Sequence, residues 1–261
     1  MEESVKCALC KQNKPLCTSH IISSFFYKHM KNKSKTKKII DSSNPKQRLQ
    51  DGFKRKLLCN DCEDIFGRLE KEFSKTYLQI FNMSKIQAIE LPIATYGLII
   101  SLAWRIIIST MGSQYPNNFT KNDLEEISKH KKIMEDYLHK NVDINYEIHC
   151  VPLMRPFIED TCMLNYSEWS ISHDVRCFDD KIVVFVKVPK LLFCLYLKNE
   201  NKDNDLWQGT RLTKCASNVW SETIRIPEFV FVFMRNAIQH AYDNVTSAIY
   251  EKAQKRLNKC D

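Results

Sequence analysis

The chain has 261 residues, is 44% hydrophobic and carries a formal net charge of +8. Its length and apolar content suffice for an ordinary hydrophobic core, which excludes a small secreted fold built on disulfides. The eleven cysteines are therefore expected to be reduced thiols or metal ligands. The start of the chain has no basic segment followed by an apolar one, so we expect no signal peptide and a cytoplasmic protein.

The first 75 residues hold all of the excess positive charge. They contain 17 Lys and Arg against 9 Asp and Glu, whereas residues 76–261 contain 22 of each. The densest basic stretch consists of Lys28, Lys31, Lys33, Lys35, Lys37 and Lys38. Such a stretch suits the binding of phosphates, and the alternative is a solvated lysine loop.

Two Cys-x-x-Cys pairs lie within this basic region, Cys7-Ala-Leu-Cys10 and Cys59-Asn-Asp-Cys62. A tight turn can place both sulfurs of each pair on the same metal ion, and four thiolates in a tetrahedron favour zinc. The 48 residues between the pairs are too many for a simple zinc ribbon. Because the second pair runs directly into a helical pattern, we expect a treble clef, in which a hairpin and a helix share the zinc ion.

Two short motifs lie between the cysteine pairs. The first is Ser19-His20-Ile21-Ile22, whose isoleucine pair is expected to anchor a strand against the zinc finger. The second runs from Arg48 to Gly52, where Asp51 and Gly52 indicate a turn. In the same motif Arg48 and Gln50 could bind a phosphate or a base edge, and turn and function can coexist.

Three helices are expected after the second cysteine pair. The first covers residues 63–81, and the third is a charged amphipathic helix at residues 121–140. The second, residues 91–111, is nearly long enough to span a bilayer but contains Arg105. We therefore favour a buried core helix over a membrane span. A buried arginine needs a carboxylate or a phosphate partner, and an ion pair is the expected role of Arg105.

The pattern changes after about residue 146. β-branched and aromatic runs at residues 181–188 and 191–197 predict a hairpin or a small sheet. Helical spacing returns at residues 227–257 and predicts a long helix packed on the sheet or on the middle helices. The expected class is α+β, with a zinc-binding domain at residues 1–82 and a helix-rich domain with a small antiparallel sheet at residues 83–261.

The motifs CALC, SHII and LLCNDCE together resemble the cysteine-bearing branch of the HNH, or ββα-metal, endonucleases. The chain is also similar to a bacterial family of uncharacterised proteins with SHI, a stretch like residues 44–52, and LLCxxCE followed by Phe and Glu. That second resemblance extends through Ala103-Trp104-Arg105 and covers roughly the first 110 residues. The remainder of the chain resembles no family that we can name.

The resemblance implies roles for particular residues. His20 matches the general base of the HNH enzymes, and Glu63 falls where the family holds a divalent-metal ligand. Ser19 stands where the family usually has an aspartate ligand, so Glu63 either restores the carboxylate or catalysis is lost. Asp51 and Glu70 are candidates for a second carboxylate on Mg²⁺ or Mn²⁺. The alternative for Glu70 is a salt bridge with Arg48 or Arg68. The alternatives for His20 are an internal structural histidine or a neighbour of the zinc ion.

The leading expectation is a metal-dependent nuclease that cleaves phosphodiester bonds, with DNA as the expected substrate. Its candidate nucleic-acid-binding residues are Arg48, Gln50, Lys35, Lys37 and Lys38. The resemblance implies a role in defence against phage, where a defence-system protein could be a partner. The long helices with apolar faces are compatible with a homodimer. The alternative is a non-catalytic zinc finger that binds nucleic acid or protein. In a third hypothesis, residues 113–261 sense a ligand or a partner, and the zinc finger produces the response.

Overall fold

The computed structural model describes residues 6–35, 37, 39–41, 48–87, 89–110, 119–178, 180–200, 206–214, 218–220 and 223–257. Within these ranges the chain forms six helices and four small antiparallel sheets. The fold is therefore mixed α+β, as the sequence predicts.

The cysteine-bearing region contains one hairpin-like strand pair and two helices. Strand β1 (Cys17–His20) pairs antiparallel with β4 (Lys54–Leu58), with a bulge between Cys17 and Thr18. The segment between them forms helix α1 (Ser24–Lys33) and a small ladder of β2 (Ile39–Ile40) with β3 (Arg48–Leu49). Helix α2 (Asn60–Asn82) begins at the residue after Cys59, so the second cysteine pair forms its first turn.

Helix α3 (Ala94–Thr110) runs through the hydrophobic core, and nearly all of its residues are buried. It lies against α2 and against α4 (Lys121–Lys140), whose N-terminus is fixed by a reciprocal capping box between Thr120 and Asp123. Among the described residues, no helix has the length and apolar composition that crossing a bilayer requires. The predicted core helix at residues 91–111 is confirmed for Ala94–Thr110. Its predicted start was three residues too early, because Leu91 belongs to a short strand, and Met111 lies outside the described residues.

The largest sheet has the strand order β6-β9-β8-β7 and is antiparallel throughout. Its strands are β6 (Ile148–Pro152), β7 (Ser172–Phe178), β8 (Lys181–Val188) and β9 (Leu191–Asn199). Strands β8 and β9 are joined by the two residues Pro189 and Lys190, and Lys190 has a φ of 66°. The predicted hairpin is confirmed and forms the centre of this sheet.

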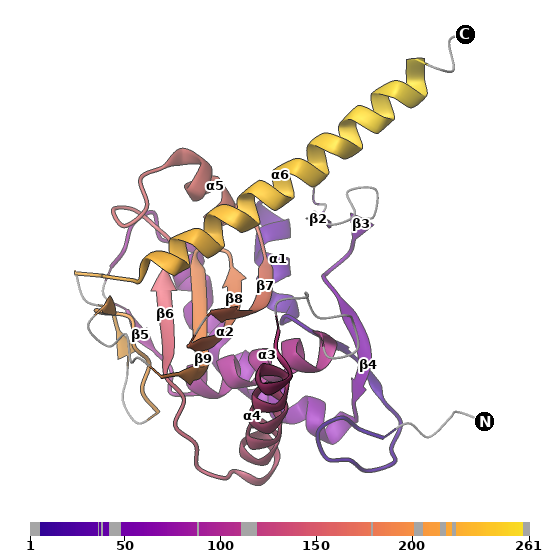
Figure 1. Ribbon diagram of the computed structural model, residues 1–261, viewed down its shortest axis with the longest axis vertical. Helices are drawn as coiled ribbons and strands as arrows, with labels where there is room; N and C mark the ends of the chain where they lie inside the picture. The colour runs from indigo at the N-terminus through magenta and orange to yellow at the C-terminus, as the bar shows by residue number, and fades with distance from the viewer. Residues whose placement is uncertain are drawn as a thin grey trace.

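Helices cover both faces of this sheet, which explains why β8 and β9 are apolar at almost every position. Val184 and Val186 belong to the hydrophobic cluster shared with α2 and α3. Their neighbours Val183 and Phe185 face a second cluster that includes Phe233 and Met234 of α6 (Glu228–Leu257). Figure 1 shows α6 crossing one face of the sheet, beside α5 (Thr161–Trp169), and then continuing beyond the body of the molecule. The prediction that the C-terminal helix packs on the sheet is confirmed.

The remaining elements are β5 (Glu90–Leu91) and β10 (Asn218–Val219), which pair with each other. Helices α1 and α5 were not expected from the sequence, and the isoleucine pair after His20 does not continue a strand. Ile21 and Ile22 are buried, but β1 ends at His20 and they lead into α1. The main hydrophobic cluster runs from Cys7 to Trp220 and so crosses the predicted domain boundary at residue 82, which stays a prediction.

Candidate metal centre and adjoining polar site

The four paired cysteines meet at one point. The sulfur atoms of Cys7, Cys10, Cys59 and Cys62 all lie within 4.8 Å of one another, and those of Cys10 and Cys59 are 3.8 Å apart. A tetrahedral zinc ion with Zn–S bonds of about 2.3 Å separates its sulfur ligands by about 3.8 Å. The donor set and its spacing therefore fit zinc, and this group can hold a metal ion as predicted.

Backbone hydrogen bonds hold the two cysteine turns next to each other without a metal ion. The amide of Ala8 donates to the carbonyl of Leu57 at 2.9 Å, which ties the first cysteine turn to β4. The amide of Cys59 points at the sulfur of Cys7 at 3.4 Å. Burial raises the pKa of the Cys7 thiol, but amide donors, that of Cys59 foremost, outweigh burial and lower it to about 7. This sulfur is thus prepared for the thiolate state that metal binding requires.

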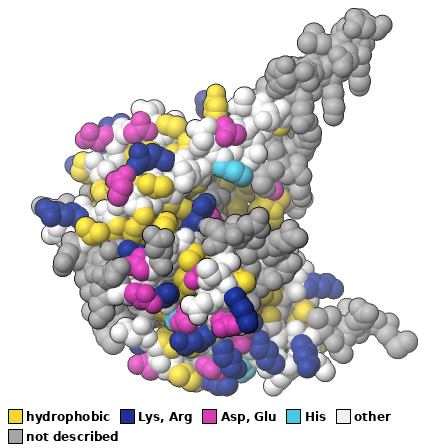
Figure 2. Space-filling view, viewed as in Figure 1, with side chains coloured by type: hydrophobic (Ala, Val, Ile, Leu, Met, Phe, Trp, Pro, Cys, Tyr) yellow, Lys and Arg dark blue, Asp and Glu magenta, His cyan; other side chains and the backbone are white. Residues whose placement is uncertain are grey.

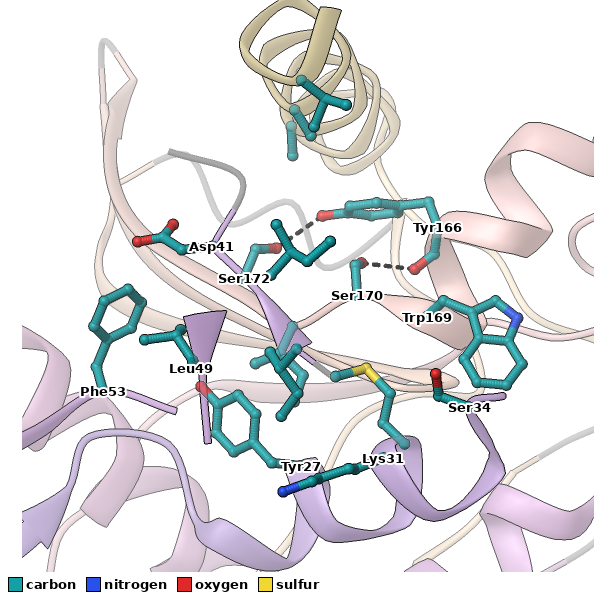
Figure 3. Close-up of a pocket in the computed structure, with 17 residues that line it drawn as sticks. Tyr27, Lys31, Ser34, Asp41, Leu49, Phe53, Tyr166, Trp169, Ser170 and Ser172 are labelled. Carbon is teal, nitrogen blue, oxygen red and sulfur yellow. Dashed lines mark hydrogen bonds between the residues drawn. The ribbon is translucent and has the colours of Figure 1, made fainter. Parts of the chain in front are cut away.

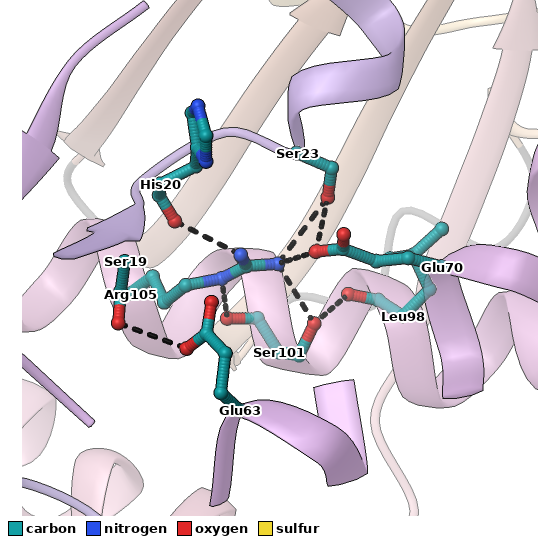
Figure 4. Close-up of polar contacts among 8 residues, drawn as sticks. All are labelled: Ser19, His20, Ser23, Glu63, Glu70, Leu98, Ser101 and Arg105. Atoms are coloured by element: carbon teal, nitrogen blue, oxygen red, sulfur yellow. Dashed lines mark hydrogen bonds and ion pairs between the residues drawn. The ribbon is translucent and has the colours of Figure 1, made fainter. Parts of the chain in front are cut away.

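The start of α2 also carries Glu63, which faces β1. The hydroxyl of Ser19 donates a hydrogen bond to Oε2 of Glu63 at 2.9 Å, and Ser19 is fully buried. Figure 4 shows these two side chains pointing toward each other, from the strand and from the helix. Because Glu63 directly follows Cys62, the metal cluster fixes the position of this carboxylate relative to β1.

His20 lies next to Ser19 but points the other way, as consecutive residues of a strand do. Its ring is turned away from Glu63 in Figure 4. Nε2 of His20 lies 3.3 Å from Oδ2 of Asp51, and the other oxygen of Asp51 binds Lys54 at 2.7 Å. The contact between the ring and Asp51 has the distance of an ion pair but not the geometry of a hydrogen bond. The hydrogen bond from Lys54, together with His20, lowers the pKa of Asp51, which is a carboxylate at neutral pH.

A buried arginine joins the two sides of this site. The guanidinium of Arg105, from α3, donates to the carbonyl of His20 at 2.9 Å and to Oε1 of Glu70 at 3.0 Å. Ser23 donates to the same Glu70 oxygen at 2.7 Å. The expectation of an ion pair for Arg105 is confirmed, and Figure 4 shows the guanidinium at the centre of the network. Glu70 is engaged in this network rather than in a metal site.

The structure does not gather the proposed Mg²⁺ ligands into one cluster. Among the described residues, the four cysteines are the one group of three or more His, Cys, Asp and Glu side chains with converging ligand atoms. Glu63 is held by Ser19, whereas Asp51 is held by Lys54 beside His20. Glu63 and Asp51 therefore lie on different sides of β1, and their carboxylates are not placed to bind the same metal ion.

The predicted nucleic-acid-binding residues lie around α1 and the β3–β4 connection. Lys35 and Lys37 are exposed in the turn after α1, and the Gln50 carbonyl accepts a hydrogen bond from Lys31 at 3.0 Å. Gly52, with a φ of 98°, confirms the predicted turn, and a side chain there would collide with Tyr27. Lys38 lies outside the described residues, and only the backbone of Arg48 is described.

The sequence interpretation missed the basic character of β4. Lys54, Arg55 and Lys56 are exposed and pair in register with His20, Ser19 and Thr18 respectively. Residues opposite each other on an antiparallel pair share a face, so Lys54 and Lys56 lie on the face of His20. The run Lys-Arg-Lys-Leu-Leu directly before the second cysteine pair was the available signal for this strand.

Comparison of the chain with protein-family models, with curated proteins and with solved structures gives no match. The resemblance to the HNH endonucleases therefore rests on the cysteine pairs, the Ser-His motif and Glu63. The chain is an α+β protein with a four-cysteine cluster able to hold a metal ion such as zinc, next to a polar site built from β1, β4 and the start of α2.

Proposed function

We propose that the cysteine-bearing region is a treble-clef zinc finger of the HNH type, and that it hydrolyses phosphodiester bonds of nucleic acid, with DNA as the primary substrate. The observation that carries the proposal is the position of Ser19 and His20 on β1 relative to Glu63. The four-cysteine cluster ends in the helix turn that presents Glu63, and the strand that faces it bears His20 at its end. Glu63 and His20 lie at the same end of this basic hairpin but on opposite sides of β1, with the imidazole turned away from the carboxylate. The proposal therefore requires the imidazole to turn toward a metal ion on Glu63 when substrate binds.

The chain's own residues would divide the reaction as follows. Glu63, with water and substrate oxygens, would hold Mg²⁺ or Mn²⁺, which when bound supplies charge neutralisation at the scissile phosphate. His20 would accept the proton of the attacking water through the ring nitrogen that does not face Asp51. The Asp51 carboxylate, 3.3 Å from Nε2 of His20, would orient the imidazole. Lys54 and Lys56, on the face of His20, would bind flanking phosphates.

A plasmid-nicking assay tests the proposal. Zinc-loaded protein is incubated with supercoiled DNA, and in parallel with labelled RNA, in the presence of Mg²⁺ or Mn²⁺. His20→Ala is expected to reduce cleavage by about 100-fold or more, because a positioned general base contributes roughly that factor. His240→Ala, on an exposed part of α6, is the matched control and should cleave like the parent chain. Equal cleavage by parent and His20→Ala would defeat the assignment.

The Ser19–Glu63 hydrogen bond favours one alternative function. Serine adds no charge to a metal site, and in this structure its hydroxyl engages one oxygen of Glu63. A finger of this kind could bind nucleic acid through its basic surface without cleaving it. That alternative predicts binding that weakens steeply with salt and no cleavage with any divalent ion. Ser19→Asp then becomes informative, since restoring a second carboxylate would raise cleavage if the site is a weakened nuclease.

Defence against phage, alone, as a homodimer or with a partner protein, is the biological role that the resemblance favours. The proposal is tested by plating phage on cells that express the parent chain or His20→Ala. Protection by the parent chain alone would support it, and equal plaque counts would oppose it.

A further inference from the structure

A pocket of about 520 Å³ lies beside the proposed active site, where the N-terminal and C-terminal parts of the chain meet. Its walls come from α1, the β2–β3 ladder, the residues that join α5 to β7, and the middle of α6. The volume falls within the range of about 300–1,000 Å³ that is usual for small-molecule sites. Figure 3 shows side chains from all these segments pointing into one space.

Exposed apolar surface gathers at this pocket. Ten large apolar side chains are exposed among the described residues, and four of them line it. They are Ile40 at 61%, Trp169 at 45%, Phe53 at 43% and Val245 at 38% exposure. Isolated exposed apolar residues need no explanation, but a contiguous group around a hollow marks a binding surface.

The polar groups of the pocket indicate what kind of ligand fits. Lys31 lines it, and the exposed Lys35 follows on the same segment, next to the lining residue Ser34. The hydroxyl groups of Ser172 and Tyr166 form a hydrogen-bonded pair 2.8 Å apart in the wall. Asp41 adds one negative charge to the rim. The two charged side chains that line the pocket, Lys31 and Asp41, balance each other, and Lys35 adds positive charge on the neighbouring segment. Aromatic side chains can stack on an unstacked nucleobase while nearby cations hold its phosphates.

The pocket is also connected directly to the proposed active site. The amide of Ile21, the residue after His20, donates to the carbonyl of Phe53 at 3.0 Å. Phe53 lines the pocket, and it lies between Asp51, which faces His20, and Lys54 of β4. A strand whose phosphates lie along β4 would thus have a base within reach of the pocket.

We propose that this pocket binds one unpaired nucleobase of a single-stranded or locally opened nucleic acid, next to the bond that is cleaved. The inference deepens the proposed function and rests on it for the identity of the ligand. It assigns Trp169, at one end of the pocket, as the side chain on which the base stacks, with Phe53 at the opposite end next to β4. Lys31, whose ammonium group also donates to the Gln50 carbonyl, is assigned as a phosphate contact. The preferred substrate would then contain unpaired nucleotides rather than a continuous duplex.

Binding of two single strands to the His20→Ala protein, with no divalent ion added, tests this proposal without cleavage. Both strands carry fluorescein and are about 12 nucleotides long, within the site sizes usual for single-strand binding, but one has abasic residues in place of all bases. Their phosphate charge is the same. The intact strand is expected to bind at least about 5-fold more tightly, as stacking of one base provides.

The pocket is then identified by a matched pair of variants. Trp169→Ala should remove most of the preference for the intact strand, whereas Tyr242→Ala, an exposed aromatic of α6 outside the pocket, should retain it. Because both side chains are exposed, neither change should impair folding. Equal affinity for the two strands, a preference unchanged in Trp169→Ala, or no binding of either strand would each overturn the proposal. A pocket that serves a protein partner would give the first of these results, and cleavage by the parent chain remains a separate measurement.

Discussion

The cysteine-bearing region and the four-stranded sheet share a hydrophobic cluster but differ in how much of their stability comes from apolar packing. In the sheet, β8 and β9 bury apolar side chains on both faces, against α2 and α3 on one side and α6 on the other. In the cysteine-bearing region, β1 and β4 form a two-stranded pair whose outer half is charged and exposed. That pair also buries Leu57 and Leu58 in the main hydrophobic cluster, and four cysteines and a few polar contacts to α2 and α3 add to this packing.

This difference shows that the chain places its apolar core in the four-stranded sheet and its candidate site in the cysteine-bearing region. An apolar sheet covered on both faces needs no metal, whereas a short hairpin with a charged edge cannot bury enough surface by itself. Figure 2 shows Lys and Arg side chains gathered in the lower part of the view, over α4 as well as the cysteine-bearing region, with acidic side chains among them.

Removal of a zinc ligand should cause the largest loss of stability, and this loss should be limited to the cysteine-bearing region. Cys62→Ala is expected to abolish zinc binding, which contributes about 10–16 kcal/mol in small zinc fingers. Because the metal ion would join the first cysteine turn to the end of β4 and the start of α2, amides of β1 and β4 should lose protection from hydrogen exchange while those of β8 and β9 keep it. Zinc content and hydrogen exchange are measured on the same sample.

The control for this experiment is Cys162→Ala, an exposed cysteine of α5 that is not a ligand. It should retain one equivalent of zinc and the parent exchange pattern. Global unfolding of Cys62→Ala would show that the two regions are a single cooperative unit and would break the comparison.

Breaking the Arg105–Glu70 pair should have the next largest effect. Arg105→Met removes the positive partner of Glu70 and leaves its carboxylate without a neutralising charge. Loss of one partner of a buried ion pair lowers the free energy of unfolding by about 3–5 kcal/mol. Denaturant unfolding at fixed zinc concentration measures this loss. The double variant Arg105→Met with Glu70→Gln should recover part of it, since the uncompensated charge is gone. Equal stability of the single and double variants would contradict a paired role.

Acid should weaken the sheet region by a smaller amount, through His149 on β6. Burial lowers the pKa of His149, although Glu147, 3.1 Å from its Nε2, opposes that shift. Below about pH 6.5 the unfolded chain therefore takes up a proton that the folded chain resists. Stability should fall as the pH drops from about 6.5, by less than about 1.4 kcal/mol per pH unit for this group.

The His149→Gln variant is expected to flatten this pH dependence, as measured by exchange of the β6 amides between pH 7 and 5.5. His240→Gln, on the exposed part of α6, is its control and should leave the slope unchanged. A slope that is the same in His149→Gln and in the parent would assign the pH dependence to other groups.

The sequence predicted the elements whose pattern is local and strong. The elements predicted at residues 121–140 and 181–188 are α4 and β8, with the same boundaries. The spacing of the two cysteine pairs also predicted correctly that the four sulfur atoms lie close together. Helix α1 was missed because its apolar residues are interleaved with lysines, which indicated a loop. Its first residues, Phe25 and Phe26, are placed by ring contacts with Tyr77 of α2, a tertiary effect that no local pattern reveals.

The polar contacts of the candidate site were less predictable than its residues. His20, Ser19 and Glu63 were named from motifs, but the direction of each side chain follows from the register of β1 with β4. The sequence also left Glu70 without a definite partner, since Arg48 and Arg68 were nearer along the chain. The partner is Arg105, 35 residues away, and only the packing of α3 against α2 brings the two together.

Helix α2 has a consequence for how this protein can be divided. Its 23 residues extend about 34 Å at the usual rise per residue, from Cys62 at one end to Tyr77 near the other. The hydroxyl of Tyr77 donates to the carbonyl of Pro189, in the turn between β8 and β9. A fragment cut at residue 82 would expose Phe73, Tyr77 and Ile80 to water. The cysteine-bearing region is therefore not expected to fold as an independent domain. Fusions that transplant it need the sheet as well.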